Sequence, residues 1–272
     1  MGGNGLRLFE TISIFIFINP LLDTMEKIIA VVSGKGGVGK TTFVSNVGTA
    51  LTEMMKDVVV VDTDLTTSNL GLQLGFYQFP LGLQDALEGN IEIANVVYTH
   101  PSGLKVIPAS ISLTYLNKVP TPYRLKTILK DLRGLVIIDS PPGLRDDALF
   151  VLRAADDIIV ITNPEIPAVT DALKVIKISR EMGKEPLGIV INRVKHNYEL
   201  KQDEIESMCD CPVIGKIPED DAVKKSLFEK TPLVSYRPYS PAAIAFRKIA
   251  ANLIGQEYKP PSFLFLRRIF QR

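Results

Sequence analysis

A glycine-rich segment with two lysines, residues 33–42, constrains this chain more than any other feature. It reads Ser-Gly-Lys-Gly-Gly-Val-Gly-Lys-Thr-Thr, follows an apolar run directly, and precedes a stretch with helical periodicity. From Gly34 to Thr41 it matches the phosphate-loop pattern G-x-x-x-x-G-K-[ST]. Glycines here let backbone N–H groups turn toward a phosphate, and the start of the next helix adds partial positive charge. The segment therefore predicts a nucleotide phosphate site.

The residue types of the loop predict the cofactors ATP and Mg²⁺. Lys40 is expected to reach the β- and γ-phosphates, Thr41 to bind Mg²⁺ through its hydroxyl, and Thr42 to reach the α-phosphate. The predicted nucleotide contacts in the loop are Gly34, Lys35, Gly36, Gly37, Val38, Gly39, Lys40, Thr41 and Thr42.

Two further apolar runs end in carboxylates. Leu135–Ile138 is followed by Asp139, which is the position where phosphate-loop ATPases hold Mg²⁺, usually through water. Val58–Val61 is followed by Asp62 and Asp64, which neighbouring strands would bring near the γ-phosphate, where a carboxylate orients an attacking water. We predict Thr41 and Asp139 as the metal site, and Lys40, Asp64 and Asp62 as catalytic residues. Capping of a loop is the alternative task for both aspartates, and more so for Asp62.

The apolar runs from Met25 onward are continuous, not alternating, which is typical of strands buried on both faces of a parallel sheet. Helical patterns separate them, so we predict an α/β, doubly wound, mostly parallel sheet flanked by helices, with ligands at the carboxyl ends of the strands. The predicted strands are Ile28–Val32, Val58–Val61, Leu104–Ile107, Leu135–Ile138, Ile158–Ile161, Leu187–Ile191 and Val213–Ile217. The predicted helices are Lys40–Met55, Tyr123–Asp131, Arg145–Ala154, Pro167–Met182, Tyr198–Met208, Asp220–Glu229 and Pro241–Ile254.

The chain of 272 residues divides into three predicted parts. Residues 1–24 form a leader that is either disordered or the product of a misassigned start, because Ile12–Ile18 is too short to span a membrane and Met25 makes a natural start. Residues 25–258 form the ATPase domain, and residues 259–272 form a hinge and tail. Cys209 and Cys211, one residue apart, fit neither a disulfide framework nor a zinc site, and favour a reduced cytoplasmic protein.

The segment from Lys35 to Thr42 resembles the deviant Walker A motif of the MinD/ParA family, a SIMIBI-type group of P-loop ATPases. The resemblance runs from Met25 to the C-terminus and looks closest to the MinD branch. It implies that Lys35 crosses to the nucleotide of a partner subunit, which adds Lys35 to the predicted catalytic residues, and that ATP drives formation of a homodimer. It also implies slow hydrolysis until a regulatory protein, which the sequence does not identify, activates it.

Further segments carry the same resemblance. Asp62-x-Asp64 with Asn69-Leu70 looks like the first switch of the family, and Asp139-Ser-Pro-Pro-Gly looks like the second. Asn192 and Arg193 resemble the adenine-contacting segment. The loop that closes over the base is represented by Pro218, Glu219 and Asp220. The iron–sulfur branches of the family are disfavoured, because the two cysteines lie far downstream with a different spacing.

The tail beyond Pro260-Pro261 is predicted to bind an anionic membrane surface through residues 262–272. On a helix, Phe263, Leu266, Ile269 and Phe270 would share one face beside three arginines. The MinD branch has a similar membrane-targeting tail, so the ATP-bound protein is expected in the cytoplasm and peripherally on the membrane. Packing of the tail on its own domain is the alternative.

Three classes of function stay open on the sequence. The first is a MinD-like ATPase for division-site selection or, indistinguishable from it, a positioning ATPase for flagella. The second is a ParA-like ATPase that holds DNA, which is disfavoured because the net charge is +1 and acidic residues surround the basic ones. The third is a scaffold that binds nucleotide without turnover.

Overall fold

The computed structural model describes residues 27–65, 68–89, 91–109, 122–195 and 199–262. The predicted leader, residues 1–24, and ten residues of the predicted tail, 263–272, lie outside the described residues and stay predictions. Within the described ranges, no helix combines the length and the apolar composition that crossing a membrane requires.

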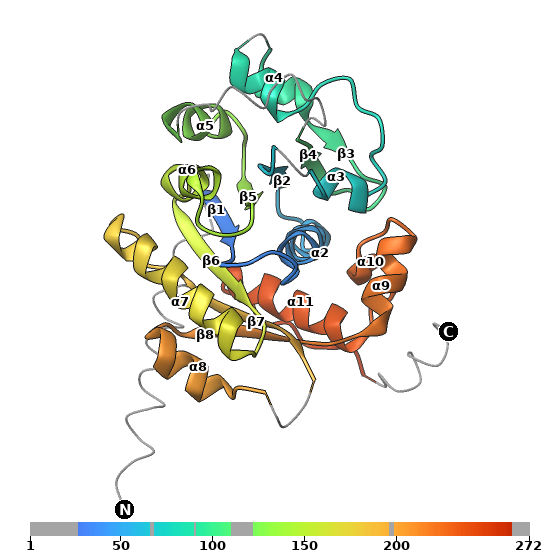
Figure 1. Ribbon diagram of the computed structural model, residues 1–272. Coiled ribbons are helices and arrows are strands. Elements are labelled where there is room, and N and C mark those ends of the chain that lie inside the picture. The colour runs from blue at the N-terminus through green and yellow to red at the C-terminus, as the bar shows by residue number, and fades with distance from the viewer. Residues whose placement is uncertain (1–26, 66–67, 90, 110–121, 196–198, 263–272) are drawn as a thin grey trace, which may run out of the picture.

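One sheet of eight strands runs through the described part of the chain, in the order β3-β4-β2-β5-β1-β6-β7-β8 (Figure 1). Every neighbouring pair is parallel except β3 with β4. The parallel strands confirm the predicted apolar runs, and the predicted fold class is confirmed with them. The strands are β1 (Lys27–Val32), β2 (Val58–Asp62), β3 (Tyr98–Thr99), β4 (Lys105–Ile107), β5 (Leu135–Asp139), β6 (Asp157–Thr162), β7 (Gly188–Val194) and β8 (Val213–Pro218).

The apolar runs are continuous because helices cover both faces of the sheet. Successive side chains of a strand point to opposite faces. Ile28 and Ala30 of β1 join one buried cluster, while Ile29 joins another that includes Phe43 and Phe246, whose ring centroids lie 6.3 Å apart. A strand with one wet face would have shown alternation instead, so the pattern reports this double cover.

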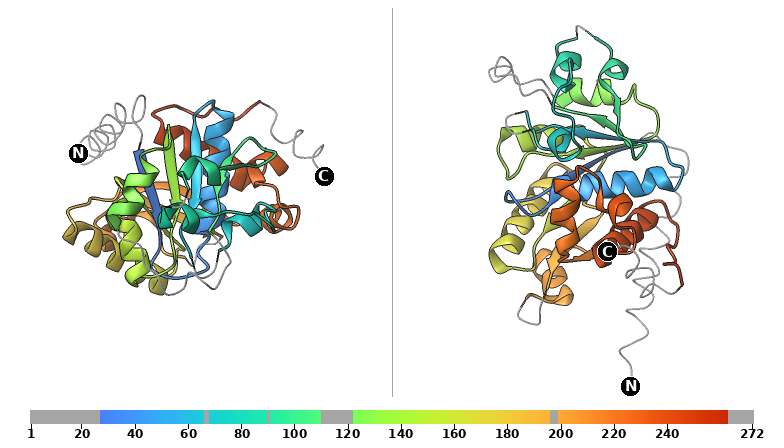
Figure 2. Two further views of the ribbon diagram at one scale, coloured as in Figure 1. Left: turned by 90° about the horizontal axis from the view of Figure 1, so that it is seen from above. Right: turned by 90° about the vertical axis from the view of Figure 1, so that its right-hand side faces the viewer.

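Helices lie in two layers, one on each face of the sheet (Figure 2), and each buried cluster takes its helices from one of these layers. The layer over Ile28 contains α4 (Leu83–Glu88), α5 (Pro122–Leu129), α6 (Asp146–Ala154), α7 (Ile166–Glu181), α8 (Gln202–Cys209) and the 3₁₀ helix η1 (Ile93–Val96). The layer over Ile29 contains α2 (Lys40–Glu53), α3 (Leu70–Gln73), α9 (Asp221–Phe228), α10 (Leu233–Tyr236) and α11 (Pro241–Leu253).

The short elements β3, α3, α4, η1 and α10 are absent from the prediction. Each spans two to six residues, which is too few for a strand or helix period to repeat. Two of these helices end beside a glycine in the left-handed region, Gly75 with φ of 79° after α3 and Gly89 with φ of 86° after α4. Tertiary contacts, and not periodicity, therefore define these elements.

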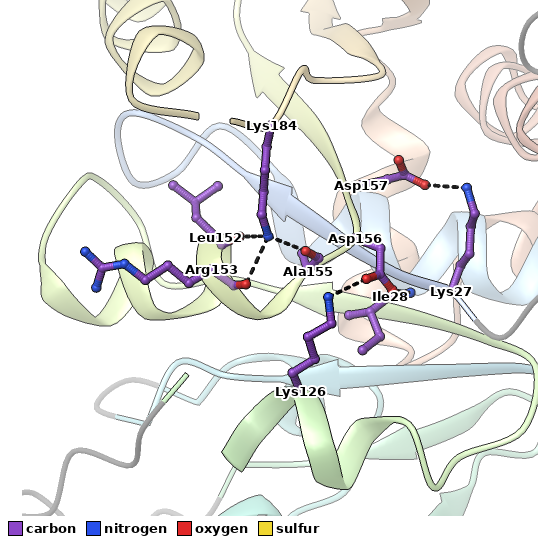
Figure 3. Close-up of polar contacts among 9 residues, drawn as sticks. All are labelled: Lys27, Ile28, Lys126, Leu152, Arg153, Ala155, Asp156, Asp157 and Lys184. Atoms are coloured by element: carbon purple, nitrogen blue, oxygen red, sulfur yellow. Dashed lines mark hydrogen bonds and ion pairs between the residues drawn. The ribbon is translucent and has the colours of Figure 1, made fainter. Parts of the chain in front are cut away.

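Lysines paired with two adjacent aspartates hold the edge of the sheet where β1 and β6 begin (Figure 3). Lys27 Nζ lies 2.9 Å from Asp157 Oδ2, and Lys126 Nζ lies 2.6 Å from Asp156 Oδ1. The second oxygen of Asp156 accepts the backbone N–H of Ile28 at 3.1 Å. The start of β1 is thus fixed to the start of β6 and to α5.

Lys184, in the turn after α7, closes the same edge by capping α6 (Figure 3). Its ammonium donates to the backbone oxygens of Leu152 at 2.7 Å, of Arg153 at 2.9 Å, and of Ala155. Carbonyls of a last helical turn lack partners within the helix, and a cation there also suits the helix dipole. These contacts tie the amino ends of β1 and β6 to α5 and α6.

Candidate functional site

A cavity of about 440 Å³ lies at the carboxyl ends of β1, β2 and β5, three strands that are neighbours in the sheet. This is where an open parallel sheet places a ligand. The wall combines the loop after β1, the segment from β2 to α3, the turn after β5, and single residues from β7 and α9. The lining residues are Gly36, Gly37, Gly39, Lys40, Thr41, Thr42, Asp62, Asp64, Asn69, Gln73, Asp139, Ser140, Pro142, Arg193 and Leu227.

Close packing shapes the loop after β1. Gly39 has a φ of 98°, in the left-handed region, and a Cβ there would meet the amide nitrogen of Asn192. That nitrogen donates to the backbone oxygen of Val38 at 2.7 Å. A Cβ at Gly34 would meet α7 at Asp171. Glycine is required at both positions by sterics, which holds the loop in one conformation.

Lys40, the first residue of α2, lies almost buried at the bottom of the cavity, with 7% exposure. Its Nζ donates to Ser33 Oγ at 3.0 Å, and that hydroxyl donates to the backbone oxygen of Lys35 at 2.7 Å. Burial lowers the pKa of Lys40, while the charges of Asp139 and Asp64 oppose this shift. An ammonium this desolvated and this close to the loop interacts strongly with any anion that enters.

Asp139, the last residue of β5, pairs in register with Asp62 of β2. Burial, with the charge of Asp62 as the second cause, raises the pKa of Asp139 to about 7, against the opposing effects of Lys40 and of the Thr41 hydroxyl. Oδ1 of Asp139 is buried and has no hydrogen-bond partner among the described residues. An unpaired buried carboxylate oxygen beside a threonine hydroxyl fits a hard cation such as Mg²⁺, which prefers oxygen ligands.

Asp62 holds the polypeptide that follows β2. Its Oδ1 accepts the backbone N–H of Asp64 at 3.0 Å, and its Oδ2 accepts donors from Ser68 at 2.9 Å and from Asn69 and Leu70 at 3.1 Å. Burial raises the pKa of Asp62 to about 6, although these hydrogen bonds oppose the shift. The structure therefore gives Asp62 the capping task that the sequence left open, and a catalytic role for it stays an untested prediction.

Asp64 lies in the same wall, with 7% exposure, and its charge acts on Lys40. Because Asp62 holds its backbone N–H, the carboxylate of Asp64 enters the cavity from a fixed point on the chain. The task of positioning a water stays a prediction. The placement leaves Asp64, Lys40 and Asp139 converging on one volume.

The predicted base contacts separate into one residue that lines the cavity and four that lie outside its lining. Arg193 lines it, and a φ of 60° at a bulge between β7 and β8 directs the chain there. Glu219 pairs with two basic residues: its Oε2 lies 3.9 Å from Arg193 Nε, and its Oε1 lies 3.6 Å from Lys195 Nζ. Asn192 supports the phosphate loop, and Pro218 ends β8.

Asp220 has a structural task at the start of two helices. One oxygen accepts the N–H of Ala222 at 2.9 Å and so caps α9, and the other accepts the N–H of Ala242 in α11 at 3.2 Å. Both oxygens are used, so Asp220 positions the predicted base loop. A direct contact with the nucleotide stays a prediction.

Lys35 lies outside the lining of the cavity. Its ammonium is 3.5 Å from Glu165 Oε2, and both side chains are solvent-accessible. An exposed pair of this kind holds little free energy, about 0–1 kcal/mol, so the ammonium is available to another partner. Gly34 and Val38 also lie behind the lining, where they shape the loop.

Comparison with known proteins decides which group of proteins shares this geometry. The CobQ/CobB/MinD/ParA nucleotide-binding domain matches residues 29–233, which is most of the chain. The chain belongs to this family. The predicted MinD/ParA resemblance is thereby confirmed.

Individual relatives share nearly the whole family domain. An uncharacterized ATP-binding protein of Methanocaldococcus jannaschii is 40% identical over 264 residues, covering 93% of this chain and 100% of that protein. The crystal structure of the cell division ATPase MinD of Pyrococcus furiosus is 34% identical, with a TM-score of 0.79, and covers 84% of this chain and 98% of that one. The septum site-determining protein MinD of Pyrococcus horikoshii, complexed with Mg-ADP, is 34% identical with a TM-score of 0.78, covering 84% and 95%.

Sequence reasoning missed two residues of the cavity, Gln73 and Leu227. Gln73 stands four residues after Asn69, the N-cap of α3, and its N–H donates to the backbone oxygen of Asn69 at 2.9 Å. That spacing could have identified Gln73 once a helix was expected there. Nothing in the local sequence marks Leu227. It lies at the cavity because the chain after α9 comes close to the loop that follows α3, where a Cβ built on Gly75 would lie 3.2 Å from Lys230 Cβ.

The raised pKa of Asp139 predicts an unusual dependence of stability on pH. A carboxyl whose pKa is higher folded than unfolded contributes stability below about pH 4, which is lost as pH rises through about 7. We therefore expect Asp139→Asn, without nucleotide and metal, to unfold with a free energy about 1–4 kcal/mol above wild type at pH 8. The gain should shrink at pH 5. Denaturant titrations at both pH values measure it.

The exposed Asp131 offers a matched control for this test. Asp131→Asn should change the unfolding free energy by less than about 0.5 kcal/mol at either pH. A wild type more stable than Asp139→Asn at pH 8 would contradict the assigned burial cost.

Proposed function

We propose that the protein is a MinD-like ATPase that binds Mg·ATP, dimerises around it and hydrolyses it slowly. The observation that carries this proposal is the convergence of Lys40, Asp64 and Asp139 on one cavity at the end of a phosphate loop. Family membership supports nucleotide and Mg²⁺ binding, since a relative of known structure holds Mg-ADP.

The triphosphate would lie along the loop after β1. Backbone N–H groups of residues 36–42 and the start of α2 provide donors and partial positive charge for it. Lys40 is the buried cation for the β- and γ-phosphates, and Thr42 would contact the α-phosphate. Arg193 is placed to contact the base from the end of β7.

Thr41 and Asp139 would hold Mg²⁺, Thr41 through its hydroxyl and Asp139 through water or directly. Among the described residues there is no cluster of three or more histidine, cysteine, aspartate or glutamate side chains suited to a metal. A metal held by one or two protein groups together with phosphates suits Mg²⁺, which keeps several of its waters. When bound, it would neutralise charge that develops on the phosphates.

Hydrolysis would proceed by attack of a water oxygen on the γ-phosphorus, with cleavage of the bond to the β,γ-bridging oxygen. Asp64 would orient this water and accept a hydrogen bond from it, while Lys40 stabilises the charge on the transferring group. The bridging oxygen leaves with ADP, and the water protons end on phosphate. Asp62 would act indirectly by holding Asp64 in place. Turnover is slow until an activating protein completes the site.

The dimer would depend on Lys35, whose exposed ammonium lies at the surface beside the loop. By resemblance it crosses to the phosphates of the partner subunit, where a triphosphate offers one more negative group than a diphosphate. The exchange of Glu165 for a phosphate is favourable only while the γ-phosphate is present. ATP would thereby hold two copies together, and its hydrolysis would release them.

The biological setting follows the relatives, some of which are named for septum-site determination and cell division. We infer a role in division-site selection or a related positioning task, in the cytoplasm and on an anionic membrane surface contacted by residues 262–272. A dimer presents two tails together, and avidity of this kind raises apparent affinity by about 10²–10⁴. DNA partition and a scaffold without turnover are the competing functions.

Turnover separates an ATPase from a scaffold. We expect Asp64→Ala to keep Mg·ATP affinity within about threefold but to lower the hydrolysis rate roughly 10²-fold, because only the orientation of water is lost. Lys40→Ala serves as the control that loses nucleotide binding. Equilibrium binding and phosphate release measure both. An Asp64→Ala protein with wild-type turnover would remove this assignment.

The dimer proposal depends on Lys35. We expect wild type to elute as a dimer with ATP and as a monomer with ADP in gel filtration, and Lys35→Ala to stay monomeric with ATP while still binding it. Lys105 is another exposed, ion-paired lysine, and it lies at the amino end of β4, away from the phosphate loop. The Lys105→Ala protein should dimerise normally. Nucleotide-driven pairing that survives Lys35→Ala would overturn the switch mechanism.

Membrane binding depends on the tail. The full chain with ATP should sediment with vesicles of anionic lipid, whereas a chain ending at residue 261 should stay in the supernatant. Vesicles of neutral lipid control for the charge contribution. Equal sedimentation of both chains would count against the tail, and an ATP-dependent DNA mobility shift instead would favour the partition function.

A further inference from the structure

Gln73, the last residue of α3, has a side chain that the functions described above do not use. It lines the nucleotide cavity. Its Oε1 is buried and has no hydrogen-bond partner among the described residues. A buried acceptor without a donor is costly to the folded state, and such groups are rare in native proteins. Because Gln73 lines the cavity, a ligand bound there could supply the missing donor.

The structure holds Gln73 at this wall from both ends of α3. Before the helix, Asp62 accepts the N–H groups of Asn69 and Leu70, which fixes its first turn. After the helix, a Cβ built on Gly75 would lie 3.2 Å from Lys230 Cβ in the α9–α10 turn, so glycine fits closely there. Gln73 follows Asn69 by four residues, so both face the cavity. The contacts at both ends of α3 therefore keep the Gln73 side chain at the cavity wall.

The chemistry of an amide oxygen selects the group that would satisfy it. An acceptor needs a donor, and neither a phosphate oxygen nor the carboxylates of this wall can donate when ionised. The cationic donor Lys40 bonds to Ser33, and its remaining N–H groups are assigned to the phosphates. A nucleotide and its hydration bring O–H donors into this cavity, from the ribose and from water, besides the N–H donors of the adenine amine.

We propose that Gln73 is a further contact of the nucleotide site, whose side-chain amide accepts a hydrogen bond from an O–H group of the bound ligand. This inference rests on the proposed function. The O–H group has two sources, a ribose hydroxyl or a water at the phosphates. A glutamine orients the attacking water in other P-loop proteins, so the second source would make Gln73 a partner of Asp64.

The unpaired oxygen of Gln73 makes a ligand contact distinguishable from a purely structural role, because its removal should weaken nucleotide binding without lowering the melting temperature. Replacing Gln73 with methionine keeps the length and the helix propensity of the side chain and removes the unpaired oxygen. The nucleotide-free variant should melt at the same temperature as wild type or higher. The same variant should bind or turn over nucleotide less well, because one hydrogen bond with the ligand is gone.

The experiment compares Gln73→Met with wild type and with Gln78→Met. Gln78 is exposed, lies in the same segment and is outside the cavity lining, so it is a matched control. Melting temperature without nucleotide, dissociation constants for Mg·ATP, Mg·ADP, 2′-deoxy-ATP and 3′-deoxy-ATP, and turnover at saturating ATP are measured for all three proteins. Gln78→Met should match wild type throughout.

A ribose contact predicts that Gln73→Met weakens ATP and ADP binding about 3- to 10-fold, the range of one net hydrogen bond. One deoxynucleotide should then bind wild type and variant equally, because each lacks one partner of the same bond. A water contact predicts that the deoxynucleotides behave like ATP. Turnover should fall, or the affinity for ATP should fall more than that for ADP.

Three results would overturn the proposal. They are affinities and turnover within twofold of wild type, a lower melting temperature of the nucleotide-free variant, and an equal loss of affinity for ATP, ADP and both deoxynucleotides. A wild type that does not bind Mg·ATP would overturn the proposed function, and this inference with it. A wild type that binds without turnover would overturn only the proposed hydrolysis, since the affinities still decide the role of Gln73.

Discussion

The burial of one ammonium among three carboxylates is the interaction on which the rest of this structure depends. Lys40, Asp62, Asp64 and Asp139 are each 7% exposed or less, and one positive charge stands against three acids. Desolvation in such a place disfavours every charged form, which is why the pKa of Lys40 is lowered and those of Asp62 and Asp139 are raised. The arrangement is costly on its own, and the proposed Mg²⁺ and polyphosphate would together balance its charges.

Hydrogen bonds connect the carboxylates of this charge cluster to the backbone of the surrounding chain. The carboxylate of Asp62 accepts the backbone N–H of Asp64 and, at the start of α3, the N–H groups of Asn69 and Leu70. Thr63 donates from its N–H at 3.0 Å and from its hydroxyl at 2.8 Å to the backbone oxygen of Asp139. The segment after β2 is therefore bonded directly to the end of β5.

The parallel strands were predictable, and the short elements were not. Runs such as Leu135–Ile138 are apolar at every position because both faces of the sheet are covered, so composition alone reveals them. The helix α3 has four residues, and its first residue, Leu70, donates its N–H to the carboxylate of Asp62 at the end of β2. Local sequence cannot signal an element whose hydrogen-bond acceptor lies elsewhere. Gln73 escaped notice for this reason, since without α3 its position on the cavity wall cannot be inferred.

The sequence by itself determined the phosphate loop, the carboxylates that end β2 and β5, and the positions of the parallel strands along the chain, because each depends on local sterics, charge or periodicity. Only the tertiary structure decided which task each polar residue has. It gave Asp62 and Asp220 to backbone capping, and it turned Asn192 toward the backbone of Val38. The physical reason is that a hydrogen bond joins two groups, and for these residues the second group lies on another part of the chain.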